Sequence, residues 1–201
     1  MHEHERRWQP LTVDAVAGLL ADAAFPWWIA GGIALELAVG HEIRGHSDID
    51  VLILRPHHLD ARQLLADWDC WVADPPGSLR PWSVGTRLDD GVHDVWCREE
   101  PDGDWRLQLM LDETAGSAWI SRRDSAIRAP ISSITRTTAN GIRYLAPHIQ
   151  LYYKAKSLRE KDEIDFKAVI GAGVAMDKEW LRDAISHSYG MQHPWLPQLG
   201  D

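Results

Sequence analysis

The stretch from residue 25 to residue 54, FPWWIAGGIALELAVGHEIRGHSDIDVLIL, decides the fold that we expect for this chain. It begins with a short apolar run rich in aromatic and branched residues, which is typical of a strand, and Gly31 and Gly32 end that run. Apolar residues then recur at helical spacing as far as Val39, and Gly40 is suited to end a helix. A polar loop leads into residues 48–54, whose branched side chains predict a second strand. The expected order is therefore strand, glycine turn, helix, loop and strand.

The segments on either side of this stretch predict further strands and helices. Thr12 is a suitable N-cap for a helix that begins at Val13, and Pro56 begins a helix that runs to Trp68. Two runs of alternating polarity flank Asp102-Gly103, a pair that is typical of a hairpin turn. Short strands are expected at residues 70–73, 92–99, 105–111, 119–120, 131–135 and 142–145.

The last quarter of the chain has a helical pattern. Pro147 is suited to the first position of a helix, Ser157 to Glu160 form a capping box that restarts one, and a last helix is expected near residues 178–186. We therefore predict an α/β (α+β) fold, in which a mixed β-sheet flanked by helices occupies residues 1–146. Residues 147–201 are expected to form a C-terminal helical region packed on that domain.

Composition limits the classes of function. The 201 residues carry 21 Lys and Arg against 30 Asp and Glu, a formal net charge of −9. An acidic chain binds nucleic acid and anionic membranes poorly, so a polyphosphate needs local cations, a metal ion or backbone amides. No apolar run reaches about 18 residues, and residues 1–8 lack the apolar region of a signal peptide. We expect a cytoplasmic protein without a membrane span, a signal peptide or a nucleic-acid partner.

Several well-known catalytic motifs are absent. There is no phosphate-binding P-loop sequence, no Gly-x-Gly-x-x-Gly after a strand and no Gly-x-Ser-x-Gly. The segment from His41 to His46 has one residue too many for the His-Glu-x-x-His zinc motif. Cys70 and Cys97 are too few for a disulfide scaffold or a cysteine-based zinc site. These absences argue against a zinc hydrolase.

The strongest chemical signal is a pair of carboxylates, Asp48 and Asp50, at the start of the second apolar strand. Alternate residues of a strand face the same side, so the two carboxylates are expected to lie together. Two adjacent negative charges repel unless a cation lies between them, and Mg²⁺ prefers one or two carboxylates together with substrate phosphates. The glycine turn at a helix start adds backbone amides for phosphate oxygens. The pattern predicts a nucleotidyl-transfer site.

These residues also resemble a known family. IAGGIAL at residues 29–35 and RGHSDIDV at residues 44–51 resemble the DNA polymerase β-type nucleotidyltransferase superfamily, in the form found in small bacterial aminoglycoside and lincosamide nucleotidyltransferases. The resemblance extends over about residues 11–170. It implies Mg²⁺, ATP or another NTP, and transfer of a nucleoside monophosphate to a hydroxyl of a small-molecule acceptor.

The resemblance assigns roles to individual residues. Asp48 and Asp50 would bind the metal ion and act in catalysis. Residues expected to contact the nucleotide are Gly31, Gly32, Arg44, His46 and Lys154. The family has a third carboxylate where this chain has Gln108, so Asp112 at the strand end, or Asp94 on the paired strand, is the candidate to replace it.

Three further hypotheses concern the acceptor and the general base. His148, at the start of a helix, is a candidate general base, with a solvated histidine as the alternative. Trp82 and Trp119 are candidates for an acceptor pocket. Glu160, Asp162, Glu163 and Asp165 are expected to form an exposed acidic face that would attract a cationic aminoglycoside. The alternative functions are a non-catalytic nucleotide-binding or antitoxin-like partner protein of the same fold, and adenylylation of a protein.

Overall fold

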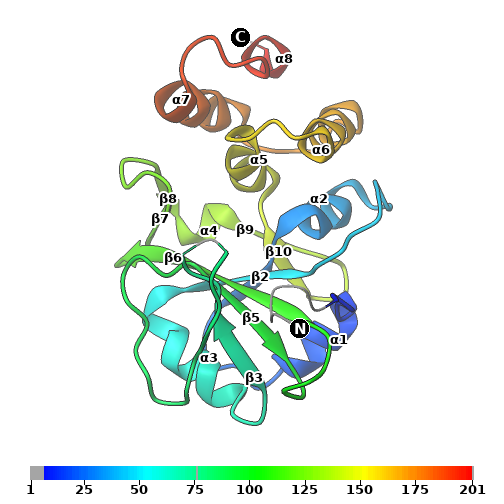
Figure 1. The fold of residues 1–201 in the computed structure, drawn as a ribbon. Helices are drawn as coiled ribbons and strands as arrows, with labels where there is room; N and C mark the ends of the chain where they lie inside the picture. Colours follow the sequence, from blue (N-terminus) through cyan, green and yellow to red (C-terminus); the bar gives the residue numbers. More distant parts are fainter. Residues whose placement is uncertain (1–6, 76, 201) are drawn as a thin grey trace.

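The structure is a computed structural model that describes residues 7–75 and 77–200, and these residues form a mixed sheet with helices on both faces (Figure 1). The strands are β1 (Trp27–Ile29), β2 (Asp50–Leu54), β3 (Asp69–Val72), β4 (Arg80–Pro81), β5 (Asp94–Arg98), β6 (Leu107–Ala115), β7 (Ala118–Ile120), β8 (Arg128–Pro130), β9 (Thr135–Thr137) and β10 (Arg143–Leu145). The helices are α1 (Val13–Leu19), α2 (Gly31–Val39), α3 (His58–Leu64), α4 (Ile131–Ile134), α5 (Pro147–Ala155), α6 (Glu160–Gly171), α7 (Lys178–Tyr189) and α8 (Leu196–Leu199). A 3₁₀ turn, Arg55–His57, precedes α3.

Strand β2 lies in the middle of the sheet and sets the position of the candidate site. The strand order is β4-β3-β5-β6-β2-β1-β10-β9, and β7 and β8 continue from β6. Strand β2 is parallel to β6 and antiparallel to β1, with Asp50 opposite Gln108. The first residue of β2 therefore lies at the same edge of the sheet as the start of β6.

Two hydrophobic clusters cover the two faces of the sheet. Val51 and Ile53 of β2 belong to the cluster under α1 and α3, whereas Leu52 and Leu54 belong to the cluster on the side of α2 and α5. Because alternate side chains of β2 are buried on opposite faces, the strand is apolar from Val51 to Leu54 and does not alternate. The predicted mixed sheet flanked by helices is confirmed.

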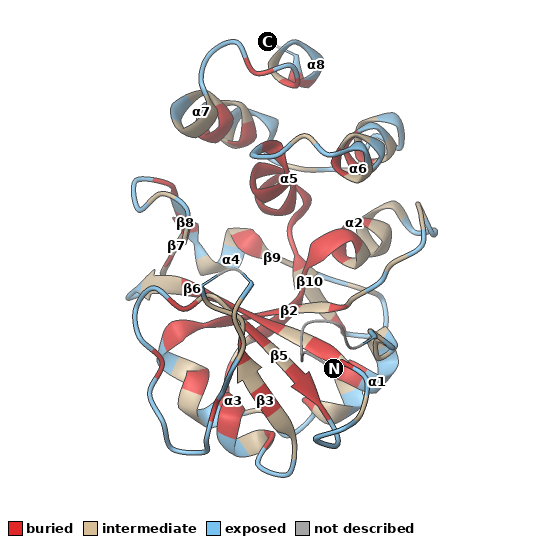
Figure 2. Cartoon of the chain, in the orientation of Figure 1, coloured by how far each residue is buried: buried red, intermediate tan, exposed pale blue. Residues whose placement is uncertain are grey.

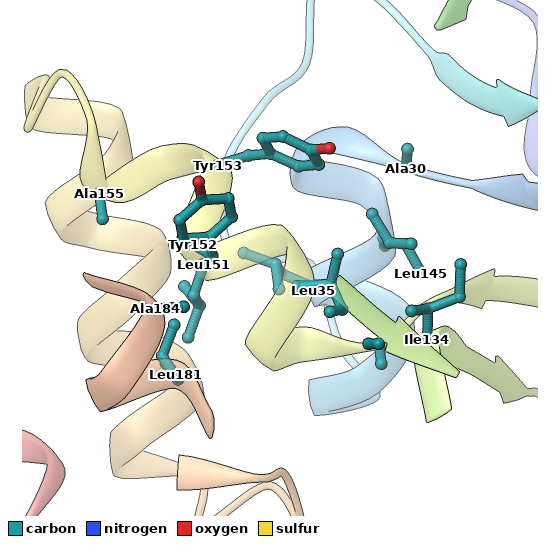
Figure 3. Close-up of a cluster of buried hydrophobic side chains, with 14 of the residues drawn as sticks. Ala30, Leu35, Ile134, Leu145, Leu151, Tyr152, Tyr153, Ala155, Leu181 and Ala184 are labelled. Carbon is teal, nitrogen blue, oxygen red and sulfur yellow. The ribbon is translucent and has the colours of Figure 1, made fainter. Parts of the chain in front are cut away.

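The C-terminal helices continue the second cluster. All nine residues of α5 are buried (Figure 2). Leu35 of α2, Leu151 of α5 and Leu181 of α7 lie in one apolar cluster (Figure 3). The predicted boundary at residue 146 falls just before α5 and remains a prediction, since the same cluster extends on both sides of it.

Some local predictions are wrong. Residues 131–134 form helix α4 and not a strand, and the strand begins only at Thr135. Strand β2 begins at Asp50, so Asp48 lies in the preceding loop. The N-cap of helix α6 is Arg159, whose backbone N–H donates to Asp162 Oδ2 at 3.2 Å, and not Ser157. Each of these residues lies where a loop meets a regular element, and there the local pattern is weakest.

No helix among the described residues is long and apolar enough to cross a membrane. The expectation that there is no signal peptide rests on residues 1–8, of which the first six lie outside the described part of the chain.

Candidate functional site

A pocket of about 250 Å³ lies at the edge of the sheet where β2 begins. It contains both predicted carboxylates, both predicted glycines, Arg44, His46 and Lys154. The other residues that line it are Asp94, Gln108, Met110, Arg122, Arg123, Gln150, Tyr153, Arg159 and Lys161. The structure therefore brings together seven residues that are spread over more than a hundred positions of the sequence.

The glycine pair allows three side chains to approach the start of α2. Gly31 has a φ of +67°, and a Cβ atom there would lie 2.2 Å from Asp50 Oδ2. A Cβ atom at Gly32 would lie 2.3 Å from His46 Cε1 and 2.5 Å from Arg44 Nη2. The Gly31 N–H donates to Gln150 Oε1 at 2.8 Å. A phosphate contact with this N–H would have to replace that hydrogen bond.

The Asp50 carboxylate is in an environment that opposes its negative charge. Burial raises its pKa to about 7, and the charges of Asp48 and Asp94 act in the same direction, while Arg122 and Lys154 partly oppose them. A divalent cation would relieve this repulsion, and a carboxylate pair is a ligand set that suits Mg²⁺. The described residues contain no group of three or more His, Cys, Asp or Glu side chains placed to hold a metal ion. The protein would thus supply two carboxylates, and phosphates and water the other ligands.

Glu36 of α2 fixes the loop that carries Arg44 and His46. Its Oε1 lies 2.8 Å from His46 Nε2 and accepts from the backbone N–H groups of Ile43 at 2.8 Å and Arg44 at 3.1 Å. Burial raises the pKa of Glu36, but these hydrogen bonds outweigh it, and the net effect is a pKa below the ordinary value. A charged Glu36 therefore holds the His46 ring against Gly32.

Two cations of the pocket are held by a single buried carboxylate of α6. Arg44 donates to both oxygens of Asp165, each at 2.9 Å, and Lys154 Nζ lies 2.7 Å from Asp165 Oδ2. Lys154 also lies 3.3 Å from Asp162 Oδ1. Both aspartates are fully buried. The prediction of an exposed acidic face is therefore wrong for Asp162 and Asp165.

Asp94 is the candidate third carboxylate that reaches the pocket. Gln108 Nε2 donates to Asp94 Oδ1 at 3.0 Å, and Arg122 Nη1 lies 3.4 Å from the same oxygen. Asp94 also lines a cavity of about 670 Å³ and another of about 280 Å³. Asp94 thus lies where three cavities meet. Its partner Gln108 is directly opposite Asp50 across the parallel strands β2 and β6.

The structure does not bring Asp112 into this pocket. Its carboxylate is fully buried and accepts from Trp119 Nε1 and from the Tyr153 hydroxyl, each at 2.7 Å. It shares a strand face with Gln108, but four residues of a strand span about 13 Å. The shared face was predicted correctly, and the distance along the strand explains why Asp112 lies elsewhere.

His148 also lies away from the pocket. It is 2% exposed, and its ring packs against Trp180. Burial, helped by the charge of Arg136, lowers the pKa of His148 to about 4. On a helix, a residue two positions before Gln150 faces the opposite side. The prediction of a solvated histidine or of a general base in the pocket is therefore not met.

Four further cations line the pocket and were not predicted from the sequence: Arg122, Arg123, Arg159 and Lys161. Arg122 and Arg123 follow β7 after one intervening residue, and β7 pairs with β6 as an antiparallel hairpin. A pair of adjacent arginines in an acidic chain was the only sequence signal available.

The 670 Å³ cavity adjoins the pocket and shares Asp94, Arg122 and Arg123 with it. Tyr152 and Tyr189 also line it, with ring centroids 5.5 Å apart in a stacked arrangement. Its charged lining residues are Asp74, Asp94, Asp124, Arg122, Arg123 and Lys156, three acidic and three basic, together with His93. Trp82 and Trp119 do not line it, because both are fully buried in the core.

Comparisons with known proteins agree with this geometry. Residues 12–80, just over a third of the chain, match the aminoglycoside-2''-adenylyltransferase family model. The matched segment contains the glycine pair and residues 44–51, so the resemblance to antibiotic-resistance nucleotidyltransferases that was predicted from these residues is confirmed. Comparison with curated protein sequences finds no match.

Three solved structures share the fold. The solution structure of the antibiotic-resistance factor ANT(2'')-Ia has a TM-score of 0.54 at 14% identity and covers 86% of each chain. The lincosamide antibiotic adenylyltransferase LnuA with lincomycin bound has a TM-score of 0.55 at 16% identity, over 80% of this chain and 98% of that one. ANT(2'')-Ia in complex with adenylyl-2''-tobramycin has a TM-score of 0.52 at 15% identity, over 87% and 93%. At these identities the likeness establishes the nucleotidyltransferase fold.

Proposed function

We propose that the chain is a Mg²⁺-dependent nucleotidyltransferase that transfers AMP, or another nucleoside monophosphate, from an NTP to a hydroxyl of a small-molecule antibiotic. The observation that carries this proposal is the shared pocket of Asp48, Asp50, the glycine pair and a group of cations. The family match at residues 12–80 supports the same reaction class.

The cations make the pocket suitable for a triphosphate. The chain has a net charge of −9, yet six of its basic side chains line this one pocket: Arg44, Arg122, Arg123, Lys154, Arg159 and Lys161. Charge-assisted hydrogen bonds from such groups are the usual way to bind phosphate oxygens. Asp48 and Asp50 would hold Mg²⁺, which neutralises developing charge in an in-line phosphoryl displacement.

The 670 Å³ cavity is the place for the acceptor, because it meets the pocket at Asp94. The acceptor oxygen would bond to the α-phosphorus while the bond from that phosphorus to the pyrophosphate oxygen breaks. Asp94 would take the hydroxyl proton, and Gln108 would hold Asp94 in place through its 3.0 Å hydrogen bond. Pyrophosphate and the nucleotidylated acceptor are the products.

The direct test measures pyrophosphate release and the mass of the acceptor, with ATP, Mg²⁺ and a panel of aminoglycosides and lincosamides. Asp50→Asn removes a charged carboxylate from the pocket and should lower the rate about 10²-fold or more. Asp60→Asn, on exposed α3 surface across the sheet, is the matched control and should keep full activity. Equal activity of the two variants would overturn the assignment. ATP binding without transfer to any acceptor would instead favour the non-catalytic partner protein or protein adenylylation.

The charge balance of the cavity bears on the choice of acceptor. Three acidic and three basic side chains line it, so a polycationic aminoglycoside gains little net attraction there. We therefore favour a weakly charged, lincosamide-like acceptor over a polycationic one. The acceptor KM should change little between low and high ionic strength. A steep rise of KM with salt would favour the aminoglycoside instead.

A further inference from the structure

The two cysteines face each other across two neighbouring strands. Cys70 of β3 is directly opposite Cys97 of β5 in the antiparallel register. The Cys70 carbonyl accepts from the Trp82 N–H at 2.8 Å, and the Cys97 carbonyl accepts from the Arg106 N–H at 2.9 Å. Both cysteines thus direct their backbone hydrogen bonds away from each other. They form a non-hydrogen-bonded pair, in which the two Cα atoms lie about 4.5 Å apart, inside the range that a disulfide can span.

The two thiols also interact with each other in the folded chain. Both side chains are buried, at 2% and 0% exposure, in the cluster under α3. The hydrogen bond between the thiols lowers the pKa of Cys70, whereas burial raises the pKa of Cys97 well above its ordinary value. Cys70 is therefore the better nucleophile of the pair, since the thiolate is the reactive form.

We propose that Cys70 and Cys97 are a redox modification site, at which a peroxide converts two buried thiols into a cross-strand disulfide. The Cys70 thiol loses its proton, and the thiolate attacks a peroxide oxygen. The O–O bond breaks, the leaving hydroxide takes up that proton as water, and Cys70 sulfenic acid results. The Cys97 sulfur then attacks the Cys70 sulfur, and the S–O bond breaks. The hydroxide leaves with the Cys97 proton as a second water. Two thiols lose two electrons, and one peroxide molecule gains them.

The position of the two cysteines explains how a peroxide reaches Cys70 and how a disulfide would affect the neighbouring cavity. Among the residues that the structure describes, the sheet continues beyond β3 with only the two-residue strand β4. Both of its residues are exposed, so local opening at this end exposes Cys70. The bond would close a loop over residues 71–96. Ala73, Asp74, Gly91, His93 and Asp94, which line the 670 Å³ cavity, all belong to that loop. Oxidation would therefore restrain one wall of the cavity.

The test uses the full folded chain and does not require that the chain transfer a nucleotide. After treatment with hydrogen peroxide, non-reducing peptide mapping should show one intramolecular link between Cys70 and Cys97, and a thiol reductant should restore both thiols. The oxidised chain should also resist proteolysis within residues 73–93. Two thiols that stay reduced under conditions that oxidise an exposed thiol would overturn the proposal, as would links only between chains.

The order of the two steps gives a second, sharper readout. In Cys97→Ser, Cys70 should stop at the sulfenic acid, which a dimedone-type probe traps. In Cys70→Ser, Cys97 should not react, because its thiol is the less acidic of the two. Circular dichroism of both variants checks that they fold. The opposite labelling pattern, or equal labelling, would contradict the assignment of Cys70 as the nucleophile, and the wild-type mapping remains decisive if either variant fails to fold.

Discussion

Replacing Gly32 with Ala should disable the pocket without unfolding the chain. The added Cβ would lie 2.3 Å from His46 Cε1 and 2.5 Å from Arg44 Nη2, whereas ordinary contacts begin at 3.4 Å. Both side chains would have to move by about 1 Å. Neither is free to do so, because Glu36 holds the His46 ring at 2.8 Å and Asp165 holds both arms of Arg44 at 2.9 Å.

The expected size of the effect follows from this displacement. Misplacing a positioning group by 1 Å costs about 10²-fold in rate, which corresponds to about 2.7 kcal/mol of transition-state stabilisation. We therefore expect kcat/KM for the NTP to fall about 10²-fold in Gly32→Ala. The melting temperature should fall by only a few degrees, because overpacking costs about 1–3 kcal/mol. The chain should stay folded, because Gly32 does not have a positive φ and Ala favours a helix.

Gly45→Ala is the matched control. Gly45 lies in the loop between Arg44 and His46, has no positive φ and has no atom within 4 Å of an added Cβ. Pyrophosphate release should be measured for both variants over a range of ATP concentrations, with Mg²⁺ and an accepted substrate at saturation, and thermal unfolding should be measured beside it. If Gly32→Ala is as active as Gly45→Ala, the close packing of Arg44 and His46 on α2 does not matter for the reaction.

Three further outcomes are expected. Asp112→Asn should lower the melting temperature, because the buried carboxylate accepts two hydrogen bonds and leaving such bonds unmade costs about 1–3 kcal/mol. The variant should keep kcat within about threefold, because Asp112 lies outside the pocket. A selective loss of kcat would instead place Asp112 in the site. Asp165→Asn should raise the KM for the NTP more than it lowers kcat, because Arg44 and Lys154 lose their anchor, and steady-state kinetics at fixed acceptor measures this. His148 has a pKa of about 4 when folded, below the ordinary value of 6.5, so the unfolded state binds its proton more readily and stability should fall as pH drops from 6.5 to 4. Urea unfolding across this range should show a smaller decline in His148→Gln.

The sequence predicts those parts of the site that depend on a local pattern of strand, turn and helix. Gly31, Gly32, Asp48 and Asp50 lie within twenty residues of one another, and the strand–turn–helix order alone places them together. Arg122 could not be placed in this way, because its position depends on where the β6–β7 hairpin returns. The alternation of residues within a strand predicts which face of the sheet a side chain lies on. It does not predict which distant segments of the chain lie beside that side chain.

The burial of the α6 aspartates could have been predicted. Asp162, Asp165, Phe166 and Val169 are spaced as i, i+3, i+4 and i+7, and all four are buried. Two acids on the apolar stripe of a helix indicate buried ion pairs, since a buried charge needs a partner. The net negative charge of the segment suggested an exposed face instead, and the spacing carried the better information.

The contact of Asp165 with Arg44 has a consequence for the order of events during synthesis. A chain leaves the ribosome from its N-terminus and its domains fold as units, so the glycine pair and both pocket carboxylates emerge long before α5 and α6. Until residue 165 has been made, Arg44 lacks its anchor, and Lys154 is missing or lacks its 2.7 Å contact with Asp165. A nascent chain of about 150 residues would then present an incomplete phosphate site, which lacks the cations Lys154, Arg159 and Lys161. Nucleotide capture would begin only when the last helices have joined the sheet, so a prematurely terminated chain would not sequester ATP.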